Sequence, residues 1–346
     1  MYFDLAMPLT LFVVTVVVIL LHDKTESKLK RTFEEREFKV KDAILLVAAI
    51  SVAVSVIVFI PQLALMIFFL FAYSLLLFIF TYLFSDVKKA HAKLFCIAFS
   101  VVSFTAATVC LFSSMFSDVL LAYGAAALYS LCGLSFIALV YEENRKGSGA
   151  RWYLATMPPV LFLALYVFFN MTPIWFPYLL SMFGLIFAVL ITLYIGSLFT
   201  WKSTLVFAGL LTFVDIVLVL VTRTMVSAAT HVSGLRLPML VVLPTLPQIT
   251  INGSTLFMSL GLGDLFFAGL LAVQMYKKFG RTIAFLSAAA MSFSFLIFEA
   301  FILNFRIRAF PGTLMIICGW LPIMFLESLK NSTAAKQATN PTGSLL

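Results

Sequence analysis

The chain has 346 residues; 63% are hydrophobic, 11% are charged, and the mean hydropathy is +1.11. Soluble domains carry about 25% charged residues, so this composition excludes a water-soluble globular protein and a disordered chain. The net charge of +8 needs no nucleic-acid partner, because basic residues of membrane proteins collect in their cytoplasmic loops. The sequence predicts an all-α polytopic membrane protein.

Apolar runs that are long enough, or nearly long enough, to cross the hydrocarbon core follow one another along the chain. They lie at 5–21, 43–60, 63–84, 94–115, 119–140, 153–170, 176–200, 205–226, 255–276, 283–305 and 310–326. These eleven runs predict a bundle of 9–11 transmembrane helices, with tight hairpins at Pro61-Gln62 and around Ser117-Asp118. The first run has no basic stretch before it and no cleavage site after it, so we expect a retained span and not a signal peptide.

The charged loops predict an orientation. With the N-terminus outside and the C-terminus in the cytoplasm, nineteen Lys and Arg residues fall inside and four outside; such a bias is typical of membrane proteins. The type of membrane and the oligomeric state stay open. We expect a transmembrane scaffold at 1–170, a functional transmembrane region at 171–330 and a disordered polar tail at 331–346.

Cysteine and histidine residues give no sign of a metal site. Each cysteine lies in an apolar run without a close partner, and the histidines fall in loops or at helix ends without an HExxH motif. The seven residues are Cys96, Cys110, Cys132, Cys318, His22, His91 and His231. We therefore expect no metal site at these residues.

Three acidic residues, Asp215, Asp264 and Glu299, lie inside predicted spans. A carboxylate near the bilayer centre costs about 2.5–3.5 kcal/mol on insertion scales, so each marks a candidate functional site. Glu299 lies seven residues before Arg306 near a helix end, where a structural pair or an interfacial position explains it.

Asp215 and Asp264 are predicted to lie at one depth. Each is about ten residues into its apolar run, and the two runs are consecutive and antiparallel. Two carboxyls in a low dielectric cannot both ionise easily, so the pair shares one proton. One ionised and one protonated carboxyl can activate water and polarise a peptide carbonyl, as in an aspartic protease. Such hydrolysis needs neither a metal nor an organic cofactor, so we expect neither.

Glycines precede the second acid in the string Gly261-Leu262-Gly263-Asp264. Glycine lets another backbone approach closely, which an extended peptide needs if it is to reach a membrane-buried acid. Together with Phe213-Val214-Asp215 and the proline-bounded segment 237–244, this string resembles the presenilin and signal peptide peptidase family of intramembrane aspartyl proteases. The resemblance covers about residues 176–326, and the predicted orientation is similar to the signal peptide peptidase branch.

The chain departs from the family pattern at three points. Val214 stands where the family usually has Tyr, and Pro311-Gly312-Thr313-Leu314 stands where a Pro-Ala-Leu motif opens the last helix, so only Pro311 carries over. The family has nine spans, whereas eleven runs are counted here.

The resemblance implies that Asp215 and Asp264 are the catalytic dyad, that Gly261 and Gly263 leave room for the substrate, and that substrates are membrane helices with the N-terminus inside, such as remnant signal peptides. The segment 237–244 reads either as a short strand, whose edge at Leu240 and Val241 accepts an unwound substrate, or as a simple connector. The membrane lipid is the other expected partner.

Other functions must account for the same acids. A proton- or cation-coupled transporter uses intramembrane Asp residues, but the two halves of the chain show no internal repeat. A prepilin-type peptidase resembles this chain in its GxGD string, but that family has a basic residue soon after it, where Leu265-Phe266-Phe267 stands here. A serine protease is disfavoured because Gly147-Ser148-Gly149 lies in a charged loop.

Overall fold

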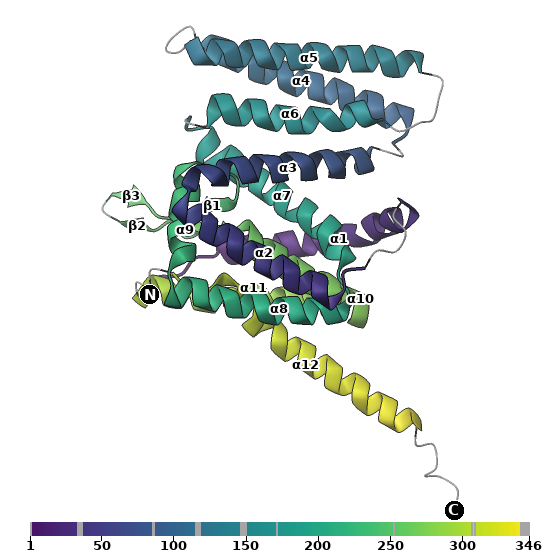
Figure 1. Cartoon of the computed structure of the whole chain (residues 1–346), viewed down its shortest axis with the longest axis vertical. Helices are drawn as coiled ribbons and strands as arrows, with labels where there is room; N and C mark the ends of the chain where they lie inside the picture. Colours follow the sequence, from purple (N-terminus) through teal and green to yellow (C-terminus); the bar gives the residue numbers. More distant parts are fainter. Residues whose placement is uncertain are drawn as a thin grey trace, which may run out of the picture. The chain divides into compact units, whose positions relative to one another are not determined.

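The structure is a computed structural model that describes residues 2–32, 37–84, 87–114, 119–145, 151–170, 172–251, 253–305, 307 and 309–339. Within these ranges the chain is mostly helical, and Figure 1 shows the helices as long rods. The predicted Ser117-Asp118 hairpin, Arg306, Arg308, the Gly147-Ser148-Gly149 string and residues 340–346 lie outside the described residues.

Twelve α-helices occur in the described residues, and short π-helical segments, η1 (Trp175–Leu179) and η3 (Val217–Val221), extend two of them. The helices are α1 (Ala6–Thr32), α2 (Val40–Phe59), α3 (Pro61–Leu83), α4 (Lys89–Ser114), α5 (Val119–Asn144), α6 (Trp152–Phe169), α7 (Leu180–Ile195), α8 (Trp201–Ile216), α9 (Thr224–Gly234), α10 (Leu262–Phe279), α11 (Arg281–Phe305) and α12 (Gly312–Thr339). Helices dominate because no water is present in a bilayer core to satisfy an open backbone.

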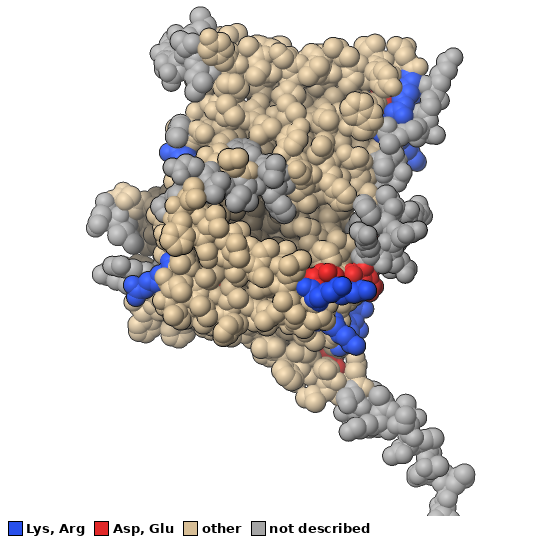
Figure 2. All heavy atoms as spheres, viewed as in Figure 1, with Lys and Arg blue, Asp and Glu red and all other residues tan. Residues whose placement is uncertain are grey.

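Nine of the helices in the described part of the chain are long and apolar enough to cross a membrane, which indicates a multi-pass membrane protein. The two runs missing from this set are α3, which contributes the shorter apolar helix Tyr73–Leu83, and α10, which carries Asp264, Lys277 and Lys278 within 18 residues. Figure 2 agrees with this interpretation: charged atoms gather near the helix ends, and the flanks between them are uncharged.

The described residues agree with the predicted all-α polytopic bundle and add a small amount of β-structure to it. Four short strands form two antiparallel pairs, β1 (Leu240–Pro244) with β4 (Phe257–Gly261), and β2 (Thr250–Ile251) with β3 (Ser254–Thr255). The predicted run 255–276 is therefore part strand and part helix, and α10 begins only at Leu262. The hydrophobicity of this run gives no sign of where the strand ends and the helix begins, because apolar residues predominate in both.

The chain folds as two compact units, one of Met1–Leu63 with Leu179–Leu346 and one of Ala64–Tyr178. The first unit thus unites α1 and α2 with the helices that carry Asp215 and Asp264, whereas the sequence places all of 1–170 in a scaffold. Near the other terminus, α12 is helical to Thr339, beyond the predicted start of a disordered tail at residue 331. Ala, Lys and Gln in this stretch favour a helix.

The second unit contains α4, α5 and α6, which pack on one another. A buried ion pair joins them near the charged end: the Arg151 guanidinium lies 2.8 Å from the Glu142 carboxylate, and the Tyr153 hydroxyl donates to the same carboxylate. Buried ion pairs require such additional hydrogen bonds to offset their desolvation.

Candidate active site

Helices α8, α10 and α12 of the first unit pack on one another (Figure 1), and Asp215 belongs to α8 and Asp264 to α10. Local signals set where these helices begin and end. The Thr200 hydroxyl accepts from the Ser203 backbone N–H at 3.2 Å at the start of α8, a common N-terminal cap. Gly280, with a φ of +88°, ends α10.

The two aspartates lie at one level of the bundle. The rings of Trp201, at the start of α8, and Phe279, at the end of α10, are 5.7 Å apart between centroids. Asp215 follows Trp201 by 14 residues and Asp264 precedes Phe279 by 15. At about 1.5 Å per residue, both carboxyls lie about 21–23 Å from that contact, as their positions in the apolar runs predict.

Asp215 is held by the first turn of α12. The Thr313 hydroxyl donates to Asp215 Oδ2 at 2.6 Å, and the Thr313 backbone N–H donates to the same oxygen at 3.3 Å. The first N–H groups of a helix have no partner within the helix, and the helix dipole attracts an anion there. Thr313 is only 4% exposed, so this bond is shielded from solvent.

Asp264 meets the same turn of α12 through Gly312. A methyl group built on Gly312 would lie 2.6 Å from both Asp264 Cγ and Oδ1, which means that the carboxyl occupies the place of a side chain. Asp215 and Asp264 are also close enough to interact electrostatically. The adjacent residues Gly312 and Thr313 therefore bring the two carboxyls together, as the pairing of their depths predicts.

The glycines before Asp264 have different surroundings. A Cβ on Gly263 would meet nothing within 4 Å, so this exposed position of α10 faces open space. A Cβ on Gly261 would lie 3.1 Å from Asp264 Oδ2. At Gly261 the absent side chain leaves room for the Asp264 carboxyl, whereas the expected role of Gly263 in admitting a substrate backbone stays a prediction.

The strand expected within 237–244 is present as β1, but its edges are occupied. β4 pairs with one edge, and on the other the Ser181 hydroxyl of α7 donates to the Val242 carbonyl at 2.6 Å and accepts from its N–H at 3.0 Å. Val241 is fully buried, with its Cγ2 3.0 Å from a Cβ built on Gly184. Ser181 thus already occupies the backbone groups of Val242 on the free edge of β1. This differs from the expectation that a substrate strand pairs with β1 at Leu240 and Val241.

The outer edge of β4 is the one that points away from β1. Because Val242 directs its N–H and C=O to Ser181, its partner Ser259 also directs both groups outward, as in every second antiparallel pair. In the described residues no hydrogen bond engages these two groups of Ser259. β4 then continues through Gly261 directly into α10 and Asp264.

Pro311 is buried beside this site, immediately before Gly312. The resemblance points to Pro311 but not to Gly312 and Thr313, although a threonine just before an apolar run is a typical signal of a helix N-terminus. Ser181 was missed too, because a serine in an apolar run has no distinguishing signal.

Glu299 lies apart from the dyad's contacts. It is 2% exposed, it interacts electrostatically with Asp4, and its Oε2 has no hydrogen-bond partner among the described residues. Arg306, the partner expected from the sequence, lies outside the described residues.

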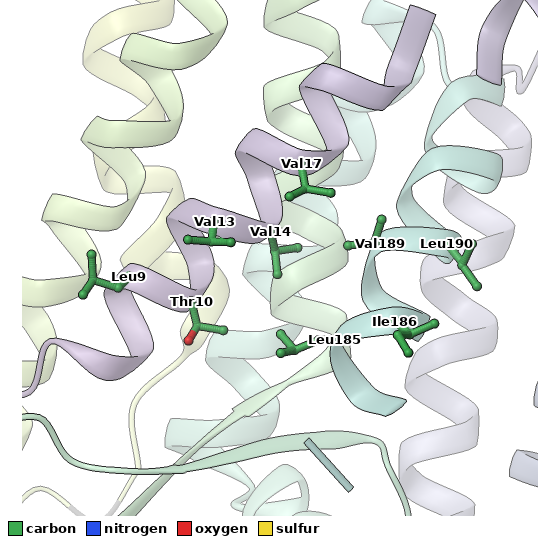
Figure 3. Close-up of a pocket in the computed structure, with 9 residues that line it drawn as sticks. All are labelled: Leu9, Thr10, Val13, Val14, Val17, Leu185, Ile186, Val189 and Leu190. Atoms are coloured by element: carbon green, nitrogen blue, oxygen red, sulfur yellow. The ribbon is translucent and has the colours of Figure 1, made fainter. Parts of the chain in front are cut away.

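An apolar cavity of about 470 Å³ lies between α1 and α7. Figure 3 shows the side chains that line it, among them Val14 of α1 and Leu185 and Val189 of α7 in the space between the two helices. Its single hydroxyl, of Thr10, donates to the Ala6 carbonyl of the same helix. This cavity holds no acid or base, so it suits an apolar chain and cannot perform hydrolysis.

No group of three or more His, Cys, Asp or Glu side chains that could hold a metal ion occurs in the described part of the chain. The chain matches no model of a known protein family, and comparison with curated proteins gives no match either. The functional assignment therefore rests on the motif residues and on their geometry.

Proposed function

We propose that this chain is an intramembrane aspartic endopeptidase, similar to the signal peptide peptidase branch of the presenilin group, with Asp215 and Asp264 as its catalytic dyad. One observation carries the proposal: two carboxyls from different helices, α8 and α10, contact adjacent residues, Gly312 and Thr313, at the N-terminus of a third helix.

The chemistry needs one ionised and one protonated carboxyl. The ionised carboxyl takes a proton from water while the water oxygen bonds to the scissile carbonyl carbon, and the protonated carboxyl gives its proton to the carbonyl oxygen. The resulting gem-diol collapses when the first acid protonates the amide nitrogen and the second takes back a hydroxyl proton. The C–N bond breaks, one water is consumed, and both carboxyls return to their starting states.

A substrate helix must unwind before its peptide bond can reach the dyad, and its freed backbone groups need new partners in the membrane. The outward N–H and C=O of Ser259 in β4 offer such partners, two residues before Gly261 begins the motif that ends in Asp264. A substrate strand paired with β4 would thus lead its peptide bond toward the dyad.

The substrate class follows from the resemblance and from the predicted orientation. Single membrane helices with the N-terminus in the cytoplasm, such as remnant signal peptides, would run in the direction that the signal peptide peptidase branch accepts.

The test is cleavage of a reporter membrane helix by the detergent-purified protein, beside Asp215→Asn and Asp264→Asn. Each variant keeps the shape of the side chain and removes its charge, so we expect loss of cleavage in both at unchanged thermal unfolding. Cleavage that survives either substitution would contradict a shared dyad.

A coupled transporter is the second candidate, and the buried Glu299 favours it as a third acid within a helix long enough to span the membrane, because transporters use several intramembrane carboxyls. It predicts no cleavage by the wild type and a pH-dependent ion or solute flux in vesicles that Asp215→Asn or Asp264→Asn abolishes.

A further inference from the structure

Thr313 distinguishes the two carboxyls of the dyad. Its hydroxyl and its backbone N–H both donate to one oxygen of Asp215, at 2.6 and 3.3 Å. A backbone N–H can only donate, and an O–H···O bond of about 2.5–2.7 Å is typical of an ionised acceptor. Asp215 therefore has the surroundings of a carboxylate.

Asp264 has different surroundings. Its carboxyl packs against Gly312 and lies beside Gly261, where a Cβ would be 3.1 Å from Asp264 Oδ2. No side chain among the described residues donates to it. When two carboxyls share one proton, that proton resides on the one whose charge is less well stabilised.

We propose that Thr313 is a positioning residue that holds Asp215 as the ionised, water-activating base and leaves the proton on Asp264, the acid that protonates the scissile carbonyl. This inference rests on the proposed protease function and deepens it. Water gives its proton to Asp215 as its oxygen bonds to the carbonyl carbon, and Asp264 gives its proton to the carbonyl oxygen. Both protons return during C–N cleavage, as described above.

The first test compares Thr313→Val, which removes the hydroxyl at similar volume, with Thr313→Ser, which keeps it. Hydrogen bonds to charged groups contribute about 1.5–3 kcal/mol, so we expect kcat to fall about 10- to 100-fold in Thr313→Val with KM unchanged. Thr313→Ser should recover most of kcat. If Thr313→Val does not fold, Thr313→Ala takes its place with the same expectation.

The second test measures binding of a peptide isostere whose hydroxyl mimics the gem-diol. Asn at position 264 imitates a neutral acid, so Asp264→Asn should bind the isostere more tightly than Asp215→Asn does. The reverse order, or a Thr313→Val enzyme with wild-type kcat, overturns the inference while the dyad stands. Absence of wild-type cleavage overturns the proposed function instead.

Discussion

At the scale of single residues, Gly312 decides how close the dyad comes to α12. The Asp264 carboxyl lies where a side chain of residue 312 would begin. Any larger residue must displace this carboxyl, since the alternative is to move the backbone of two packed helices.

Gly312→Ala is therefore expected to lower kcat by about 100-fold, because a displacement of about 1 Å at a reacting group costs that much. Stability should change little, since Ala favours a helix more than Gly does and a carboxyl can rotate. Steady-state cleavage and thermal unfolding in detergent measure the two effects.

Gly209→Ala is the matched control, because a Cβ on Gly209 of α8 would meet nothing within 4 Å. It should cleave at the wild-type rate. Full activity in Gly312→Ala would show that Asp264 works from another position.

At the scale of elements, the β1–β4 pair connects the proposed substrate-binding edge of β4 to the proposed catalytic residue Asp264. β1 is fixed to α7 through Ser181, and β4 leads into α10. The pair therefore presents one outer edge beside Asp264.

Ser259→Pro removes the outward N–H of β4 without removing a bond of the β1–β4 ladder. Losing one hydrogen bond of about 0.5–1.5 kcal/mol should lower kcat/KM about 2- to 10-fold for a membrane-helix substrate. Thermal unfolding should be nearly unchanged.

Met258→Pro is the contrasting variant, because Met258 faces Leu243 in a hydrogen-bonded pair, where proline removes a ladder bond. It should lower the unfolding temperature. Equal kcat/KM in Ser259→Pro and the wild type would argue against strand addition at β4.

At the scale of the whole first unit, hydrogen bonds connect several helices near the ends that the distribution of Lys and Arg predicts to be cytoplasmic. Tyr276 donates to the Asp23 carboxylate at 2.7 Å, and Lys277 donates to the Ser197 carbonyl at 3.0 Å. These contacts unite the ends of α1, α7 and α10. At the opposite end, the Leu246 N–H donates to Asp4 at 2.6 Å.

The orientation predicts the labelling of single cysteines in a variant whose four native cysteines are replaced by Ala. Ser233→Cys, exposed in α9, should react with a membrane-impermeant maleimide added to intact cells, because the charge count places this segment outside. Lys202→Cys, exposed at the start of α8, should react only after permeabilisation. The opposite pattern would reverse the orientation, and with it the expected direction of the substrate helix.

The sequence alone determined the features that depend on composition and on position along a helix. Apolar runs and charged loops predicted the membrane helices, because a bilayer requires about 20 apolar residues and a helical backbone. Asp215 and Asp264 could be paired by depth, since the rise per residue is constant.

Only the tertiary structure decided which groups surround the pair. Each of the contacts that matter here joins residues at least 48 positions apart in the sequence: Thr313 with Asp215, Gly312 with Asp264, and Ser181 with Val242. The hydrophobic pattern of an apolar run contains no information about such distant contacts. The strand–helix boundary at Leu262 was likewise hidden, because β4 and α10 have similar composition and differ only in the partner each one packs against.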